Sequence, residues 1–173
     1  MNCSNRKIVQ NVPVFLNLIL LMAICMIVLT GCGMDNGMSD MPFNGEVFFH
    51  DLSIEIPEDF IRDSTKSNEN QYVFEKDNYN VVIVLSKQNT NGYSLRNIVN
   101  GAESENGTVL NYDDEYTTCD IEYILSDGTY SYTHSQIYND DRYQIIVQGK
   151  NEADVKSVYD TVMAEAVIGG EVD

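Results

Sequence analysis

The sequence has no tryptophan, only three prolines and two histidines, and few basic residues. Ten lysines and arginines stand against 27 aspartates and glutamates, so the formal net charge is −17 at pH 7. Because phosphate backbones repel such a charge, nucleic acid is excluded as a default partner. His50 and His134 are too few for a multi-histidine zinc site, and no C-x-x-C pair replaces them. We therefore expect no metal and no cofactor.

Cysteine is scarce where a folded domain would need it. Of the four cysteines, Cys3 and Cys25 lie in the N-terminal 31 residues and Cys32 follows them, which leaves Cys119 alone. A single thiol forms no intramolecular disulfide, so the domain must be held together by its core. Hydrophobic residues make up 43% of the chain, with 11 tyrosines and 6 phenylalanines, which is enough for one core. The length of 173 residues fits one domain and is too short for a two-lobed solute receptor.

The N-terminal segment has the order of an export signal. Residues 1–10 contain Arg6 and Lys7 and no acid, and residues 12–29 are almost entirely apolar. A run of this length could also span a bilayer as an uncleaved anchor. The run ends in Leu29-Thr30-Gly31-Cys32, which resembles the lipobox of bacterial lipoproteins. That resemblance implies cleavage between Gly31 and Cys32, with fatty-acyl chains such as palmitate attached to Cys32.

The lipobox resemblance sets the expected organisation of the chain. Residues 1–31 are expected to be a signal peptide, 32–45 a flexible tether, 46–168 an α+β domain and 169–173 a tail. From Cys32 onward the charge is 8 − 27 = −19. Two acyl chains on one residue bind a bilayer stably. We expect the protein at the cell membrane, lipid-anchored on the extracytoplasmic face.

Apolar periodicity predicts strands at 47–49, 52–56, 71–76 and 79–86 and helices at 94–102 and 151–166. Pro57 is expected to end the second strand, because proline cannot donate a hydrogen bond to a neighbouring strand. The run 81–85 is apolar on both faces, which is typical of a central strand. Ser94 and Asn151 are expected to cap the two helices.

Asp127-Gly128 predicts a hairpin with a two-residue type I′ turn. Residues whose numbers sum to 255, such as Tyr123 and Tyr132, would then lie opposite each other on the two strands. A second loop at 139–142 would add a third strand. One face of this three-strand unit would be buried beneath the closing helix, and it would carry Cys119, His134 and the tyrosines Tyr123, Tyr130, Tyr132, Tyr138 and Tyr143. The other face would be polar and uncovered, with Asp120, Glu122, Thr133 and Ser135.

The order of elements predicts an α+β fold: an antiparallel sheet of about 5–7 strands with a short middle helix and a C-terminal helix packed on it. An early strand ends in Ser53-Ile54-Glu55-Ile56-Pro57-Glu58-Asp59-Phe60, and a later helix opens with Ser94-Leu95. In this order of elements, the chain from about Val47 to Ile168 resembles the PsbP/Mog1-like group of small domains. The resemblance implies the fold and brings no catalytic residues with it.

Three groups of residues invite a chemical interpretation. Cys119 and His134 would be diagonal neighbours, as in a nucleophilic dyad, but in an apolar core the thiol is inert and no third group is evident to orient the histidine. Residues 113–115 and 140–141 are acidic and could bind calcium, but they lack the spaced ligands of a calcium loop, which favours solvated loops. The tyrosines could line a sugar or peptide groove, although the pairing favours a core role.

These observations point to a membrane-anchored lipoprotein with a non-catalytic binding or accessory domain at the cell envelope. The alternative is a small envelope hydrolase that uses acidic residues. The preferred contact surface is the polar face with Asp120, Glu122, Thr133 and Ser135, and its partner would be an envelope protein or another basic or cation-bridged surface. On this interpretation, lysine at Asp120 and Glu122 would reduce partner capture without lowering the melting temperature.

Overall fold

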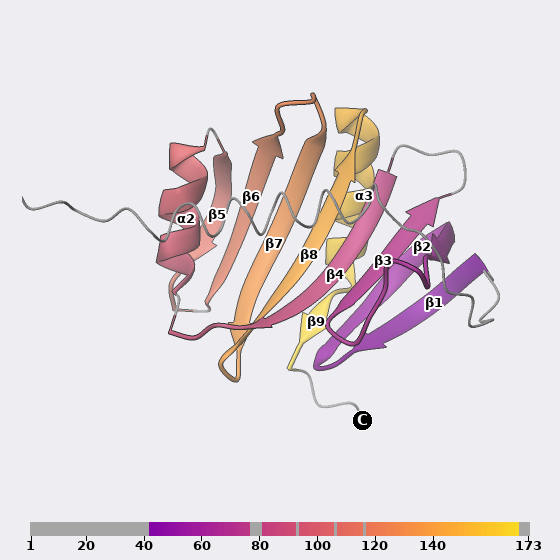
Figure 1. Cartoon of the computed structure of the whole chain (residues 1–173), viewed down its shortest axis with the longest axis horizontal. Coiled ribbons are helices and arrows are strands. Elements are labelled where there is room, and N and C mark those ends of the chain that lie inside the picture. Colours follow the sequence, from indigo (N-terminus) through magenta and orange to yellow (C-terminus); the bar gives the residue numbers. More distant parts are fainter. Residues whose placement is uncertain (1–41, 77–80, 93, 106, 116, 170–173) are drawn as a thin grey trace, which may run out of the picture. The chain divides into compact units, whose positions relative to one another are not determined.

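The structure is a computed structural model that describes residues 42–169 except 77–80, 93, 106 and 116 (Figure 1). The expected signal peptide, the lipobox with Cys32 and most of the expected tether lie outside these residues, so they remain predictions. Neither helix of the described part of the chain is long and apolar enough to cross a membrane.

The described residues form nine strands and two helices. The strands are β1 (Pro42–Phe49), β2 (Leu52–Arg62), β3 (Gln71–Lys76), β4 (Val81–Asn89), β5 (Thr108–Asp113), β6 (Thr118–Ile124), β7 (Tyr130–Tyr138), β8 (Asp141–Gly149) and β9 (Val167–Ile168), and the helices are α2 (Leu95–Ser104) and α3 (Glu152–Ala164). The prediction of about 5–7 strands was therefore wrong. The sequence interpretation missed β5 and β9, and β1 begins inside the segment expected to be tether.

All strand pairs are antiparallel, and the sheet order is β1-β2-β3-β4-β8-β7-β6-β5, with β9 on β2 (Figure 1). The long pairing of β4 with β8 joins the N-terminal strands to the C-terminal ones. The apolar run of β4 is central, as its sequence predicts. β1 and β5 are left as the two edges of this order.

Pro57 does not end β2, contrary to the sequence prediction. β2 continues to Arg62, but residues 57–59 have no partner on β1, because the pairing shifts between Phe43 and Gly45. The missing N–H of proline therefore falls at a bulge, where no ladder hydrogen bond is lost. Asp59 completes the irregularity with a positive φ of 71°.

The β6–β7 hairpin is shifted by one residue from the predicted pairing. Paired residues sum to 254, as in Cys119 with Ser135 and Asp120 with His134. The loop has three residues, because Leu125 N–H donates to the Thr129 carbonyl at 2.8 Å and Gly128 N–H donates to the Leu125 carbonyl at 2.9 Å. Gly128 has φ 76°, as in a type I turn followed by a left-handed residue. The Asp127 carboxylate accepts the Thr129 N–H at 3.0 Å, which holds this loop in place.

The two-residue turn lies instead between β7 and β8. Tyr138 pairs with Asp141, and the two residues between them, Asn139 and Asp140, have φ values of 50° and 65°. Positive φ at both positions is the requirement of a type I′ turn, and asparagine and aspartate tolerate it better than most residues. The predicted loop at 139–142 would have paired Tyr138 with Tyr143, so it was wrong by two residues, a shift that leaves the faces unchanged.

The sheet has two buried faces. The α3 face holds the main core, in which α3 packs through Val155, Tyr159 and Val162. The α2 face holds a second core beneath α2 and a small apolar cluster on β3, β4 and β8. Buried side chains of the α3 face include Phe49, Ile54, Phe74, Ile83, Tyr132, Tyr143, Ile145 and Val147, and those of the α2 face include Leu95, Val99, Cys119, Ile121, Val84 and Ile146. Both faces of β4 are thus buried.

The two helices begin differently. Asn151 caps α3, since its side-chain oxygen accepts the N–H groups of Ala153 and Asp154 at 3.0 and 3.4 Å, as predicted. Ser94 stands at the N-cap of α2 with extended backbone but makes no capping hydrogen bond through its side chain. The first turn of α2 therefore lacks the stabilisation that a capping hydroxyl would add.

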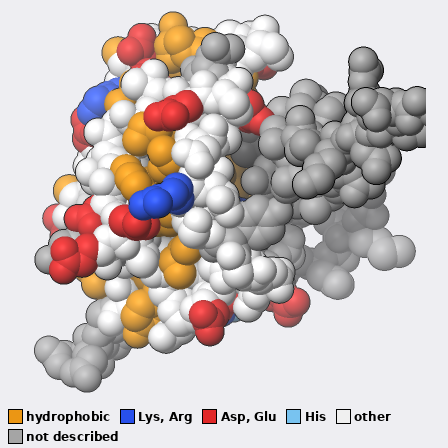
Figure 2. All heavy atoms as spheres, turned by 90° about the vertical axis from the view of Figure 1, so that its left-hand side faces the viewer, with side chains coloured by type: hydrophobic (Ala, Val, Ile, Leu, Met, Phe, Trp, Pro, Cys, Tyr) orange, Lys and Arg blue, Asp and Glu red, His pale blue; other side chains and the backbone are white. Residues whose placement is uncertain are grey.

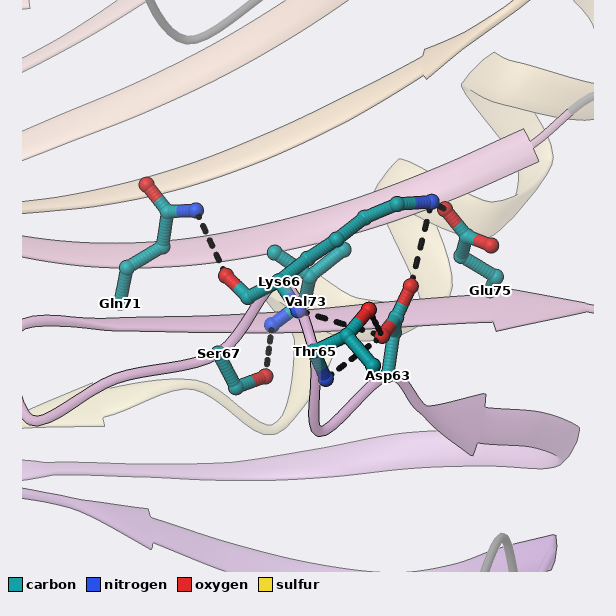
Figure 3. Close-up of polar contacts among 7 residues, drawn as sticks. All are labelled: Asp63, Thr65, Lys66, Ser67, Gln71, Val73 and Glu75. Atoms are coloured by element: carbon teal, nitrogen blue, oxygen red, sulfur yellow. Dashed lines mark hydrogen bonds and ion pairs between the residues drawn. The ribbon is translucent and has the colours of Figure 1, made fainter. Parts of the chain in front are cut away.

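A half-buried lysine fastens the loop between β2 and β3 (Figure 3). Lys66 Nζ lies 2.6 Å from Glu75 Oε1 and 3.1 Å from Asp63 Oδ2. Burial alone would lower the pKa of Lys66, but its hydrogen bonds to Glu75 and Asp63 and their charges outweigh burial and raise it. In the same loop Ser67 Oγ accepts the N–H of Val73 at 3.0 Å. The contacts of Lys66 with Glu75 and of Ser67 with Val73 join the loop to β3.

Candidate functional site

A partly buried polar cluster that joins three strands and a helix centres on Asp120 of β6. Its Oδ1 accepts the hydroxyl of Tyr159 at 2.8 Å and lies 2.7 Å from Nδ1 of His134. Its Oδ2 accepts the side-chain amide of Asn111 at 3.2 Å. We call Asn111, Asp120, His134 and Tyr159 the Asp120 cluster. It joins β5, β6, β7 and helix α3.

Burial and hydrogen bonding oppose each other at Asp120. Burial is the largest influence and would raise the pKa of the carboxyl, but hydrogen bonds from His134, Tyr159 and Asn111, with the charge of His134, lower it overall. Burial and then the Asp120 charge raise the pKa of Tyr159. Within the Asp120 cluster, the ionised carboxylate of Asp120 therefore accepts a hydrogen bond from the neutral hydroxyl of Tyr159.

The contact of Asp120 with His134 has the geometry by which a carboxylate orients a histidine in acid–base catalysis. The same geometry also satisfies a histidine inside a core, and His134 is only 9% exposed. Tyr132 lies beside the cluster, with its ring 5.5 Å from that of Tyr159, and donates its hydroxyl to Glu122 at 2.9 Å. His134 therefore lies in the interface between the sheet and α3.

Cys119 and His134 lie on opposite faces of the sheet, so the dyad considered from the sequence is not formed. The one-residue shift of the β6–β7 pairing separates them, because neighbouring register positions alternate between faces. Cys119 is fully buried in the core beneath α2, where burial and then the Asp120 charge raise its pKa to about 11. The expectation of a buried thiol is confirmed, but its place beside His134 was wrong.

We expect Cys119→Ala to lower the free energy of unfolding by about 1 kcal/mol or somewhat more, as small buried truncations do. At pH 7 a thiol with a pKa of about 11 is ionised in about one molecule in 10,000, so alkylation should be slow in the folded protein. Chemical denaturation and mass-spectrometric alkylation kinetics measure the two effects. Alkylation of the unfolded protein is the control, and equally fast labelling of the folded protein would contradict the buried role.

The same shift divides the contact surface expected from the sequence. Asp120 and Glu122 lie on the α3 face, whereas Thr133 and Ser135 lie on the α2 face, where Ser135 is fully buried. The four residues share no surface, because the type I turn with its left-handed Gly128 replaces the predicted type I′ turn. Lysine at Asp120 would also remove the contacts of the Asp120 cluster, so we expect this substitution to lower the melting temperature, in contrast to the expectation from the sequence.

The tyrosines expected on one face are divided in the same way. Tyr130, Tyr132, Tyr138 and Tyr143 belong to the α3 core or pack against it, whereas Tyr123 packs on the α2 core. Tyr143 is fully buried and donates its hydroxyl to Asp51 at 2.5 Å. These contacts support the core role that the sequence favoured over a groove for sugar or peptide.

Acidic residues of the two segments considered for calcium form ion pairs and hydrogen bonds within the domain. Asp114 pairs with Arg96 at 3.0 Å and accepts the hydroxyl of Tyr112 at 2.6 Å. Asp141 pairs with Lys87 at 2.9 Å. Within the part of the chain that the structure describes, no three histidine, cysteine or acidic side chains are grouped so that they could hold a metal ion.

Asp120 and His134 were both expected from the sequence to matter, but on different faces of the sheet, and no local pattern connected Tyr159 with either. A local signal for the correct pairing does exist. Ser126, Asp127 and Gly128 fit a three-residue loop as well as Asp127-Gly128 fits a two-residue one, because Asp127 can accept the N–H of Thr129, two residues on. With that loop, Asp120 and His134 become directly opposite.

No protein family and no curated protein sequence matches the chain. Solved structures do. A crystal structure from Bacteroides thetaiotaomicron has a TM-score of 0.52 at 14% identity and covers 76% of this chain, which spans about half (51%) of that one. This likeness shows a shared fold and nothing beyond it.

Two further structures are the namesakes of the group that the sequence resembles. The Ran-binding protein Mog1p of Saccharomyces cerevisiae has a TM-score of 0.49 at 11% identity, covering 75% of this chain and 97% of its own. Cyanobacterial PsbP (CyanoP) of Synechocystis sp. PCC 6803 has a TM-score of 0.46 at 12% identity, covering 82% and 99%. The solved structures similar to this chain therefore include both a Mog1 and a PsbP protein.

Proposed function

We propose that the protein is a lipid-anchored bacterial lipoprotein whose PsbP/Mog1-like domain acts by binding a partner at the extracytoplasmic face of the cell membrane. The signal-like N-terminus and the box ending in Cys32 support the anchor. The single observation that supports a non-catalytic domain is the separation of its two candidate catalytic side chains. Cys119 lies beneath α2, and His134 lies on the opposite face, bonded to Asp120.

The charge of the domain defines the chemistry of the partner. From Cys32 onward the chain carries 8 − 27 = −19, so an attractive surface would be basic or bridged by cations. Interactions between exposed charges are screened beyond about 8–10 Å at physiological salt. Partner binding should therefore be weakened by salt.

Chemical crosslinking of the full-length protein in its own membrane, followed by mass spectrometry of the linked peptides, tests this proposal. We expect links between the domain and one recurrent protein, with a yield that falls as sodium chloride rises from 0.05 to about 0.5 M. A crosslinker of the same reach that targets different groups is the control for reagent bias. Links that do not recur, or whose yield is insensitive to salt, would contradict binding through charge.

The contact between Asp120 and His134 favours a second candidate, a small hydrolase. In that case His134 would act as a base oriented by Asp120. Asp120→Asn would then remove activity while fold and partner binding persist. In the binding proposal, the same substitution changes stability and leaves crosslinking of the folded fraction intact.

A further inference from the structure

Strand β5 ends the sheet and pairs on one side only, with β6. Beyond its other edge lies no strand of the described chain. The outward N–H and C=O groups of such an edge can pair with another chain. Leu110 has no partner on β6, because the pairing shifts between Val109 and Asn111.

Apolar side chains are exposed beside this edge. Leu110 is 47% exposed on β5, and Ile124 is 62% exposed at the end of the neighbouring β6. They are two of the four large hydrophobic side chains that stand out as exposed in the described residues. The β5 edge, defined here as Thr108–Asp113, therefore has an exposed apolar side chain, Leu110, next to backbone groups that pair with no second strand of the described chain, while α2 packs on the face of β5.

The β5 edge lacks the residues that usually prevent strand addition. Its sequence, TVLNYD, has no proline, lysine or arginine. β1, at the other edge of the sheet, begins with Pro42 and is broken by a bulge at Gly45. Proline and bulges make an edge unsuitable for pairing, and β5 has only the bulge at Leu110. Another property must keep this edge from pairing with itself.

Negative charge around β5 disfavours pairing of this edge with a second copy of the chain. From Leu95 to Ile124 the sequence has one base, Arg96, and seven acids, a sum of 1 − 7 = −6. Figure 2 shows this side of the molecule, on which acidic side chains outnumber basic ones among interspersed hydrophobic ones. Two copies that met edge to edge would bring like charges together, which disfavours pairing. A basic strand would meet attraction instead.

We propose that the β5 edge is the docking site of an extended, basic segment of a partner protein, which adds to the sheet as a further strand. Main-chain hydrogen bonds would provide affinity, while Leu110 would contact an apolar side chain of the added strand. The inference rests on the proposed binding function and specifies its surface and partner chemistry. A second copy of the chain is the competing occupant.

The test uses the full chain in detergent and a fluorescent eight-residue peptide in which lysine alternates with valine. Leu110→Lys introduces a charge that discourages strand addition. Phe48→Lys is the matched control, since Phe48 is 53% exposed on β1 and the charge change is identical. We expect the dissociation constant to rise about tenfold or more for Leu110→Lys, a change of about 1.4 kcal/mol, and to stay within about twofold for Phe48→Lys.

Two further measurements separate strand addition from charge attraction. A peptide with methylated alternate amides keeps its charge but loses half of its donors, so it should bind at least about tenfold more weakly if strands pair. Hydrogen exchange should slow at amides of β5 when the unmethylated peptide binds. Equal binding of the methylated peptide, protection at β1 instead of β5, or no effect of Leu110→Lys would overturn the proposal.

The oligomeric state shows whether a second copy of the chain, and not a partner segment, occupies the β5 edge. Slow exchange at β5 without peptide, together with a concentration-dependent dimer, would show that a second copy occupies the edge and would overturn the proposal. A different result would contradict the proposed binding function, namely the loss of an enzymatic activity in Asp120→Asn. That result would leave the peptide measurements unaffected.

Discussion

Replacement of Cys32 by alanine should abolish fatty-acid labelling of the protein and leave an unprocessed precursor. Cys32 follows Leu29-Thr30-Gly31 and alone completes the box that resembles the lipoprotein signal. Its sulfur is the atom that would accept the diacylglyceryl group as a thioether, and alanine has no such atom. Metabolic labelling with a fatty-acid analogue, read on a gel that separates precursor from mature protein, measures both effects.

Cys25→Ala is the matched control, because Cys25 lies in the same N-terminal segment but does not follow a box of this kind. It should label and mature normally. The anchor also sets location, since two acyl chains hold a protein on a bilayer far better than one. Labelling that survives in the Cys32 variant would refute the lipoprotein interpretation and favour an uncleaved anchor.

Asp120→Ala should lower the free energy of unfolding by about 2–4 kcal/mol, because it leaves buried donors of α3 and β7 without their acceptor. Tyr159 is 7% exposed and its hydroxyl has only this partner among the described contacts, while His134 loses the contact to its Nδ1. Asp114→Ala is the control. Asp114 also has an arginine and a tyrosine as partners, but its side chain is 61% exposed, so the cost should be below about 1 kcal/mol.

The pH dependence gives the Asp120 prediction a second readout. The pKa of Asp120 is lower in the folded protein than its ordinary value of 3.8, so its ionisation stabilises the fold above that pH. This stabilisation is lost as the pH falls through the folded pKa. Asp120→Asn cannot ionise, so the stability difference from the wild type should shrink as the pH is lowered from 6 to about 3. A difference that is constant across this range would show that the charge of Asp120 contributes nothing.

The sequence by itself determined those features that depend on local chemistry. The apolar run of residues 81–85 made β4 central, because a strand without polar positions must be covered on both faces. Asn151 began α3 through its own side chain, and the alternating residues of 52–56 placed the start of β2. The burial of Cys119 in a core also followed from the sequence, since the domain has no second thiol and Cys119 alternates onto an apolar strand face.

Only the tertiary structure decided which residues meet across the sheet. Whether Asp127-Gly128 makes a loop of two residues or three depends on a small local energy difference, yet the choice shifts every pair of β6 and β7 by one position. With the three-residue loop, Asp120 meets His134 on the α3 face and Cys119 passes to the other side. Tyr159 joins them from a helix 39 residues away in sequence, a contact that no local pattern encodes. β5 was missed for the same reason, because its residues show little alternation and its place depends on pairing with β6.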